Sequence, residues 1–344
     1  MSKIPADFIA AIPKTDLHLH LDGSLRLPTL IELAKERDVE LPSYTEEGLL
    51  DLVFKESYND LPEYLHGFAY TCAVMTDSEA LERIAYELAV DNLAEGVRYI
   101  EVRFAPQLHV RPGFDIGAVL QSVVRGLARA RREHEGSPAV KDGSEPPFRY
   151  GIITCAMRMF TAGFSPYYRD LYGVLDSWPA RKVYGVASLS LARAVVDARD
   201  RLGVPVVGFD LAGAEAGYPP ADHIQAFQFA HSNFLGKTVH AGEAYGPESI
   251  FQAITLLHAD RIGHGTHLYA VEQVQADEPE RYVERLSEYI CDRRINVEVC
   301  LTSNMQTMPH LKRVADHPLG RMVRDRVSVS LCTDTRLVSR TTVT

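Results

Sequence analysis

Cysteine is scarce in this chain of 344 residues, and its spacing contains no metal or redox motif. The five cysteines are odd in number and widely scattered, and no two of them form a C-x-x-C pair; they are Cys72, Cys155, Cys291, Cys300 and Cys332. This excludes a zinc knuckle and a dithiol redox motif, and it indicates reduced thiols in the core of a cytosolic protein. The sequence also lacks a signal peptide and any run of roughly eighteen apolar residues. We therefore expect a cytoplasmic protein with no membrane partner.

Basic residues are fewer than acidic ones. Lysine and arginine number 36 against 46 aspartates and glutamates, which gives a formal net charge of −10. Such a field repels the phosphate backbone of DNA and RNA, so we expect no nucleic-acid partner. A small, roughly neutral ligand fits this composition better. The composition does not determine the oligomeric state.

Short β-rich runs alternate with helix-like segments along the whole chain. The helix-like segments carry apolar residues at three- and four-residue spacing, as in Ala80–Ala94, Val119–Ala130, Ala187–Ala198 and Ile250–Leu257. The expected strands are Thr15–Leu21, Val97–Ala105, Arg149–Met157, Val206–Leu211, Lys237–His240, Arg261–His264, Asn296–Leu301 and Val327–Thr333. Eight parallel strands joined by right-handed helical crossovers close into a barrel. The prediction is an α/β protein with one TIM (β/α)8-barrel domain over residues 1–344.

Two segments and the end of the chain depart from a minimal barrel. The segment from Asp22 to Gly96 has room for extra helices after strand 1, and we expect them to form a lid over the strand ends. The polar stretch Glu133–Pro147 is expected to be an exposed loop with little structure of its own. Only residues 335–344 follow Asp334. We therefore expect that the usual C-terminal helices are missing from this sequence.

The first expected strand carries four polar side chains on one face. Strict alternation over residues 15–22 puts the leucines on one side and Asp16, His18, His20 and Asp22 on the other. Both histidines then point to the barrel axis near the carboxyl end of the strand, where barrel enzymes place their active sites. The alternative is a hydrogen-bonded polar core, but four unpaired buried groups would each cost roughly 1–3 kcal/mol. We therefore favour a bound metal.

Three later strands end in residues that suit the same site. Strand five ends in His240, followed by Ala241, Gly242 and Glu243; strand six places His264 between two glycines; and strand eight ends near Asp334. Each segment alone could be an ordinary strand-to-loop turn, and Asp334 alone could cap a helix. Together they predict three imidazoles and one carboxylate around a catalytic Zn²⁺, with one position left for water. Nitrogen and oxygen ligands do not exclude Fe²⁺, Mn²⁺ or Co²⁺.

These motifs together resemble the adenosine deaminase family over nearly the whole chain. The matching stretches are Lys14–Gly23, Arg98–Pro106, Val207–Gly213, His240–Glu243, Ile262–Gly265, Leu301–Asn304 and Thr333–Asp334. The resemblance implies that His18, His20, His240 and Asp334 bind one zinc ion and that the substrate is a purine nucleoside such as adenosine. It implies that Glu243 serves purine N1 and that His264 orients the attacking water and accepts its proton. It further implies that His20 contacts the substrate, that the Gly213 N–H donates to N3, and that Asp22 binds the ribose 5′-hydroxyl.

One departure from the family pattern lies beside the last metal ligand. Much of the family has Asp or Asn after the equivalent of Asp334, a residue thought to meet purine N7, whereas this chain has Thr335. The shorter hydroxyl can still donate to N7 through a water, with reduced affinity or an altered base preference.

Several other functions remain to be weighed. A cytidine-deaminase site is excluded because the chain has no P-C-x-x-C motif. Aminofutalosine or free adenine as substrate, a nucleoside-binding protein without catalysis, and a two-metal amidohydrolase are the alternatives. Strand four offers no lysine to bridge two metals, and a pure binder would need neither Glu243 nor His264.

Overall fold

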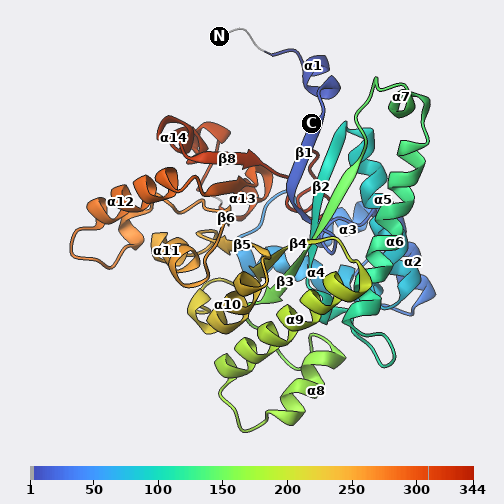
Figure 1. Ribbon diagram of the computed structural model, residues 1–344, viewed down its shortest axis with the longest axis horizontal. Helices are drawn as coiled ribbons and strands as arrows, with labels where there is room; N and C mark the ends of the chain where they lie inside the picture. The colour runs from blue at the N-terminus through green and yellow to red at the C-terminus, as the bar shows by residue number, and fades with distance from the viewer. Residues whose placement is uncertain (1–3, 309) are drawn as a thin grey trace.

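The described part of the chain forms a single sheet of eight parallel strands whose order follows the sequence. The computed structural model describes residues 4–308 and 310–344. The strands are β1 (Lys14–His20), β2 (Val97–Phe104), β3 (Arg149–Met157), β4 (Val206–Ala212), β5 (Gly236–Ala241), β6 (Arg261–His264), β7 (Asn296–Val299) and β8 (Ser328–Leu331). Helices surround the strands in Figure 1. The predicted TIM-like (β/α)8 barrel is confirmed.

The four segments with apolar periodicity are helices in the structure, and each helix begins before the expected first residue. The helices are α1 (Ala6–Ala11), α2 (Leu27–Glu36), α3 (Glu46–Leu52), α4 (Leu61–Val74), α5 (Ser78–Ala94), α6 (Ile116–Glu135), α7 (Pro138–Lys141), α8 (Pro166–Val174), α9 (Ala180–Leu202), α10 (Ile224–Ser232), α11 (Pro247–Leu256), α12 (Pro279–Asp292), α13 (Leu301–Thr307) and α14 (Leu319–Arg324). Short 3-10 turns are η1 (Pro106–Leu108), η2 (Pro220–His223), η3 (Val271–Gln273) and η4 (Val314–Asp316). Within the described residues, no helix is long and apolar enough to cross a bilayer.

Two strands end two residues before the expected residue, β7 at Val299 and β8 at Leu331, and one expected loop contains a short helix. β7 stops at Val299 and α13 begins at Leu301, so the expected strand Asn296–Leu301 was too long. The stretch Glu133–Pro147 is largely exposed, as expected, but it contains the end of α6 and the short helix α7. The Ser137 side chain accepts a hydrogen bond from the Val140 N–H, which caps α7. A helix cap within a polar stretch therefore produced structure that the composition did not predict.

The barrel closes between β8 and β1 through a short contact at the carboxyl ends of the strands. The His20 N–H donates to the Asp334 carbonyl at 2.7 Å, and the Asp334 N–H donates to the His18 carbonyl at 2.8 Å. Below this point, the Thr333 hydroxyl donates to the buried Asp16 carboxylate. The closure therefore sets Asp334 directly beside both histidines of β1.

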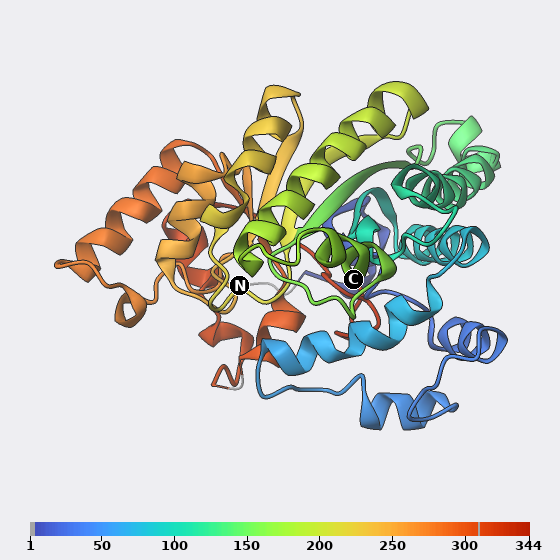
Figure 2. The ribbon, with the colours of Figure 1, turned by 90° about the horizontal axis from the view of Figure 1, so that it is seen from below.

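The segment after β1 supplies the extra helices α2, α3 and α4, which lie together on one side of the barrel in Figure 2. α4 reaches over the strand ends: the Phe68 ring packs edge-on against His20 at 6.2 Å between centroids. The Tyr64 hydroxyl of the same helix donates to Asp334 Oδ2 at 3.2 Å. The expected cover over the strand ends is therefore present, in the form of α4.

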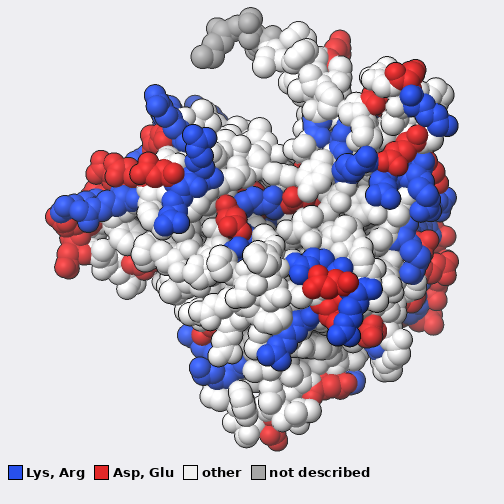
Figure 3. Space-filling view, in the orientation of Figure 1, with Lys and Arg blue, Asp and Glu red and all other residues white. Residues whose placement is uncertain are grey.

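The surface carries both signs of charge close together. On the face shown in Figure 3, lysine and arginine side chains alternate with aspartate and glutamate side chains over the peripheral helices. Many of them pair, as Arg125 does with Glu82 at 2.8 Å between α6 and α5. Exposed pairs of this kind contribute little to stability. The fold therefore depends mainly on its buried contacts.

The tightest helix contact in the barrel wall predicts a test of packing. A Cβ added at Gly126 of α6 would collide with the Glu82 carbonyl and the Tyr86 amide of α5, whereas a Cβ at Gly173 of α8 would meet open space. We expect Gly126→Ala to lower the free energy of unfolding by about 1–3 kcal/mol through overpacking. Gly173→Ala should be neutral or slightly stabilising, because alanine favours helix. Equal urea midpoints for the two variants would contradict this packing.

Candidate functional site

Three imidazoles meet at the carboxyl end of the barrel. His18 and His20 come from β1 and His240 comes from β5. The His240 Nε2 atom lies 3.1 Å from His18 Nε2 and 3.1 Å from His20 Nε2. All three residues are buried or nearly so. The period-two pattern of β1 thus brings its two histidines to one point, as predicted.

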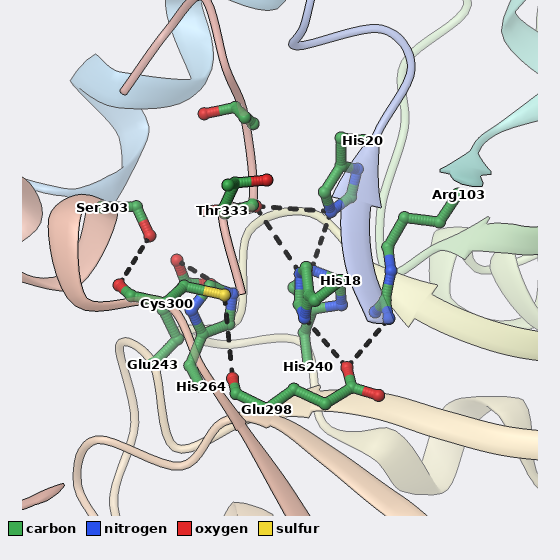
Figure 4. Close-up of polar contacts among 12 residues, drawn as sticks. His18, His20, Arg103, His240, Glu243, His264, Glu298, Cys300, Ser303 and Thr333 are labelled. Atoms are coloured by element: carbon green, nitrogen blue, oxygen red, sulfur yellow. Dashed lines mark hydrogen bonds and ion pairs between the residues drawn. The ribbon is translucent and has the colours of Figure 1, made fainter. Parts of the chain in front are cut away.

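Buried carboxylates hold the far nitrogens of two of these rings. His18 Nδ1 lies 2.9 Å from Glu298 Oε2, and His240 Nδ1 lies 3.0 Å from Asp210 Oδ2. The guanidinium of Arg103 lies between the two acids, at 2.8 Å from Glu298 and 3.1 Å from Asp210. Figure 4 shows Arg103 and His18 reaching the same Glu298 carboxylate. Carboxylates behind imidazoles are the usual outer contacts of metal-binding histidines.

This arrangement fits a cation among the three Nε2 atoms. Burial alone would raise the pKa of Asp210, but the His240 imidazole and the Arg103 guanidinium hold it well below its usual value. An ionised carboxylate only accepts, so the Nδ1 atom facing it carries the proton and Nε2 presents a lone pair. Lone pairs 3.1 Å apart repel each other unless a positive charge lies beside them. The three imidazoles therefore suit a divalent metal.

Asp334 adds a carboxylate to this group. Its Oδ1 atom lies 3.5 Å from His18 Nε2 and 3.6 Å from His20 Nε2. The residue has a φ of +66°, a conformation that costs energy for a side chain other than glycine. The backbone contact that closes the barrel holds it there. The expected ligands His18, His20, His240 and Asp334 are thus brought together.

A cavity of about 840 Å³ opens above the imidazoles. Its wall combines apolar side chains of α4, such as Leu65 and Phe68, with a few polar groups. Of the residues expected at the site, the wall contains His20, Asp22, Gly213, His240, Glu243, His264 and Asp334. This mixture is typical of a site for a small organic ligand.

Glu243 is a buried carboxyl group whose surroundings favour the protonated form. Burial raises its pKa well above the usual value, and the charges of Asp334 and Glu215 raise it further. Its Oε1 atom lies 3.6 Å from His264 Nε2. The cavity therefore has a proton donor on one wall, close to the imidazoles.

A second carboxylate, Glu215, fixes the loop that carries Glu243. It accepts the backbone N–H groups of Gly242, Glu243, Ala244 and Tyr245 and the hydroxyl of Ser249. Five donors on one buried side chain leave the loop little freedom. Sequence reasoning missed this residue, because hydrogen bonds to backbone groups leave no pattern in the partner segment.

His264 is neutral and is held between glycines. Burial lowers its pKa to about 3. A Cβ at Gly263 would lie 3.0 Å from the His18 ring, so glycine is needed for that ring to fit, in line with the Gly-His-Gly prediction. His264 itself has a φ of +66°. Both features place its ring 4.9 Å from that of His18, centroid to centroid.

A chain of hydrogen bonds behind His264 selects its tautomer. The Leu319 N–H donates to His317 Nδ1 at 3.0 Å, so His317 Nε2 carries the proton and faces Asn304 Oδ1 at 3.3 Å. The Asn304 amide nitrogen then donates to His264 Nδ1 at 3.0 Å. His264 therefore presents an N–H at Nε2 to the cavity.

Thr335 is the expected site residue that the structure places elsewhere. It is fully buried and is not part of the cavity wall. Its hydroxyl bonds to those of Tyr64 and Ser339, and its methyl group points at Gly23. Because α4 and the final residues already satisfy this hydroxyl, its contact with a ligand stays a prediction that requires these hydrogen bonds to be exchanged.

Arg103 and Glu298 were also missed by sequence reasoning, although a charged residue inside a strand is a visible signal. Arg103 and Glu298 interrupt apolar runs in β2 and β7, and both are fully buried. A charge on the inner face of a barrel strand requires a partner. The sequence shows that such partners exist but not which residues pair.

Comparison with known proteins identifies relatives of the whole barrel. Residues 13–164 and 182–344 match the family model described as adenosine deaminase. A curated adenosine deaminase from Mycolicibacterium vanbaalenii is 37% identical over 339 residues, covering 98% of this chain and 83% of the relative.

Solved structures share the fold. The N6-methyl-AMP deaminase from Arabidopsis thaliana is 25% identical with a TM-score of 0.70, covering 98% of this chain and 84% of the other. An amidohydrolase from Burkholderia ambifaria, solved with bound Zn, has a TM-score of 0.74 at 20% identity, covering 98% and 80%.

The carboxylate behind His240 provides a test of the metal centre. We expect Asp210→Asn to weaken metal binding roughly 10–100-fold, because the amide cannot fix the Nδ1–H tautomer as a carboxylate does. The measurement is a zinc titration against a competing chelator. Asp200→Asn, at an exposed position of α9, is the control and should leave affinity unchanged. Wild-type affinity in Asp210→Asn would show that the Asp210 carboxylate does not fix a metal-binding tautomer of His240.

Proposed function

Because this chain belongs to the adenosine deaminase family of metal-dependent deaminases, we propose that it converts adenosine, and 2′-deoxyadenosine, to the corresponding inosine and ammonia. The observation that carries the proposal is a buried Glu243, whose pKa is raised, facing a neutral His264 above three converging imidazoles. Hydrolysis at purine C6 needs an activated water, a proton at N1 and a group that orients the water. Each of these has a candidate here.

The proposed metal is a single Zn²⁺ ion held by His18, His20, His240 and Asp334. When bound there, it would supply a water that is acidic enough to attack at neutral pH. The chain's own residues do the rest: they place the purine, exclude bulk solvent and move protons.

Glu243 is proposed to face purine N1. Attack at C6 breaks the aromaticity of the ring and puts negative charge on N1, so a carboxylic acid that donates there stabilises the transition state more than the substrate. This requires Glu243 to be protonated, which its burial and its acidic neighbours favour.

His264 is proposed to orient the attacking oxygen on the far side of C6. With the proton on Nε2, the ring donates a hydrogen bond to that oxygen. The role of proton acceptor, which the family resemblance implies, requires the opposite tautomer and therefore a turn of the Asn304 amide. The donor role needs no such rearrangement.

Gly213 and Asp22 are proposed to read the rest of the nucleoside. Gly213 lies on the cavity wall with a φ of +96°, where a Cβ would lie 3.2 Å from Met157; its N–H is proposed to donate to N3. Asp22 is proposed to accept from the ribose 5′-hydroxyl. A carboxylate at that point would repel a 5′-phosphate, which favours a nucleoside over a nucleotide.

A substrate panel tests the proposed specificity. On zinc-loaded protein we expect kcat/KM to be highest for adenosine, lower for free adenine, which lacks the ribose hydroxyl, and lower for N6-methyl-AMP and aminofutalosine. The readout is the ultraviolet change on loss of the 6-amino group, together with released ammonia. Turnover of adenine or of either other compound above that of adenosine would replace the proposed substrate. Binding of adenosine without ammonia release would identify a nucleoside-binding protein.

Replacing the proton donor tests the mechanism. We expect Glu243→Gln to lower kcat roughly 10²–10⁴-fold while the zinc content stays at one per chain. In the wild type, kcat should fall as the pH rises through the raised pKa of Glu243, because only the protonated carboxyl donates to N1. The exposed Glu272→Gln is the control and should keep full activity. A variant at position 243 with wild-type kcat would exclude this role.

A further inference from the structure

A second group of metal-binding side chains lies beside the cavity, apart from the three imidazoles. Asp22 follows β1, Cys72 belongs to α4, and His109 follows the turn η1. One ligand atom from each residue, a carboxylate oxygen, a thiol sulfur and an imidazole nitrogen, lies within 4.8 Å of the other two. Three segments far apart in sequence thus bring donor atoms to one place.

The buried imidazole of His109 has one nitrogen without a hydrogen-bond partner among the described residues. The ring is fully buried, and its Nδ1 lies 3.1 Å from the Met75 carbonyl oxygen. A carbonyl only accepts, so Nδ1 carries the proton and Nε2 is the free acceptor. Among the described residues, Nε2 has no hydrogen-bond partner. Burial also lowers the pKa of His109 to about 4, which keeps the ring neutral.

The carboxylate of Asp22 faces the same point. It is 4% exposed, and its Oδ1 atom has no hydrogen-bond partner within the described residues. The nearest basic atom, His20 Nδ1, lies 3.6 Å away, beyond hydrogen-bond distance. Asp22 Oδ1 and His109 Nε2 are both acceptors, so neither can satisfy the other. A buried acceptor left unpaired costs about 1–3 kcal/mol.

We propose that Asp22, Cys72 and His109 form a second cation site, for Zn²⁺ or another divalent cation of similar softness, with its open coordination position toward the cavity. Oxygen, sulfur and nitrogen donors together are a ligand set that Zn²⁺ accepts. A water molecule could donate to the two acceptors and accept from the Cys72 thiol, so the cobalt titration below is chosen to distinguish a cation from a water.

Binding exchanges a proton for the cation. The S–H bond of Cys72 breaks as the sulfur–metal bond forms, and the proton leaves to solvent. Burial raises the pKa of the Cys72 thiol well above its usual value, so the thiol remains protonated until a cation arrives. Arg111 lies on the same cavity wall and its positive charge opposes a cation. The second site is therefore weaker than the three-imidazole site.

The functional consequence rests on the proposed function. Asp22 is the residue assigned to the ribose hydroxyl, so a cation bound to Asp22 and adenosine compete for the same carboxylate. Excess Zn²⁺ then raises KM for adenosine and leaves kcat unchanged.

Cobalt absorption tests the site without relying on activity. Protein loaded with one equivalent of Zn²⁺ is titrated with Co²⁺, and sulfur-to-cobalt charge-transfer absorption in the near ultraviolet is recorded. The wild type should take up a second equivalent and show this absorption. Cys72→Ser should lose it, and His109→Gln should weaken cobalt binding at least about tenfold. Cys155→Ser removes another thiol of the cavity wall and should keep the absorption. One retained equivalent of zinc shows that each variant is folded.

Each outcome decides the matter. No second equivalent, uptake without thiolate absorption, or absorption that persists in Cys72→Ser overturns the site. Cobalt absorption without adenosine turnover supports the site and contradicts the proposed function. Adenosine turnover that excess zinc leaves unchanged, together with no cobalt absorption, supports the proposed function and contradicts the second site.

Discussion

The guanidinium of Arg103, buried in the middle of the barrel, is the contact on which the metal centre depends. It pairs with both Asp210 and Glu298, whose like charges would otherwise repel each other in the buried interior. The two acids in turn contact the Nδ1 atoms of His240 and His18 and so fix the orientation of both rings. The orientation of the imidazoles thus depends on the contacts of Arg103 with Asp210 and Glu298, which lie behind the rings.

Local pattern predicted most of the fold and the meeting of the candidate ligands, because both depend largely on periodicity within single segments. Alternation in β1 suffices to place His18 and His20 on the barrel axis. Pairing between segments was not predictable: Arg103 reaches Asp210 and Glu298 only because of strand register, and Glu215 binds backbone groups that any sequence would offer. The buried contact of Thr335 with Tyr64 was unpredictable for the same reason, since Tyr64 reaches it from a distant segment.

Burial acts in opposite directions on the two groups above the imidazoles. It disfavours the charged form of both, so the pKa of the Glu243 carboxyl is raised well above its usual value and the pKa of the His264 ring is lowered well below its own. Pairs of titratable groups driven apart in this way are typical of sites that move protons. The left-handed backbone at His264 and Asp334 lies in the same place. Backbone strain and burial of titratable groups therefore occur together at the carboxyl ends of the strands.

The seam between β8 and β1 links the metal centre to the integrity of the barrel. The residue whose carboxylate faces the imidazoles is also the one whose backbone joins the first strand to the last. A cation bound by Asp334 and the two β1 histidines would cross-link the first and last strands of the barrel. Removing the cation with a chelator would then weaken the contact between β8 and β1 and, through Tyr64, the packing of α4. Resistance to proteolysis would therefore increase with occupancy of the metal site.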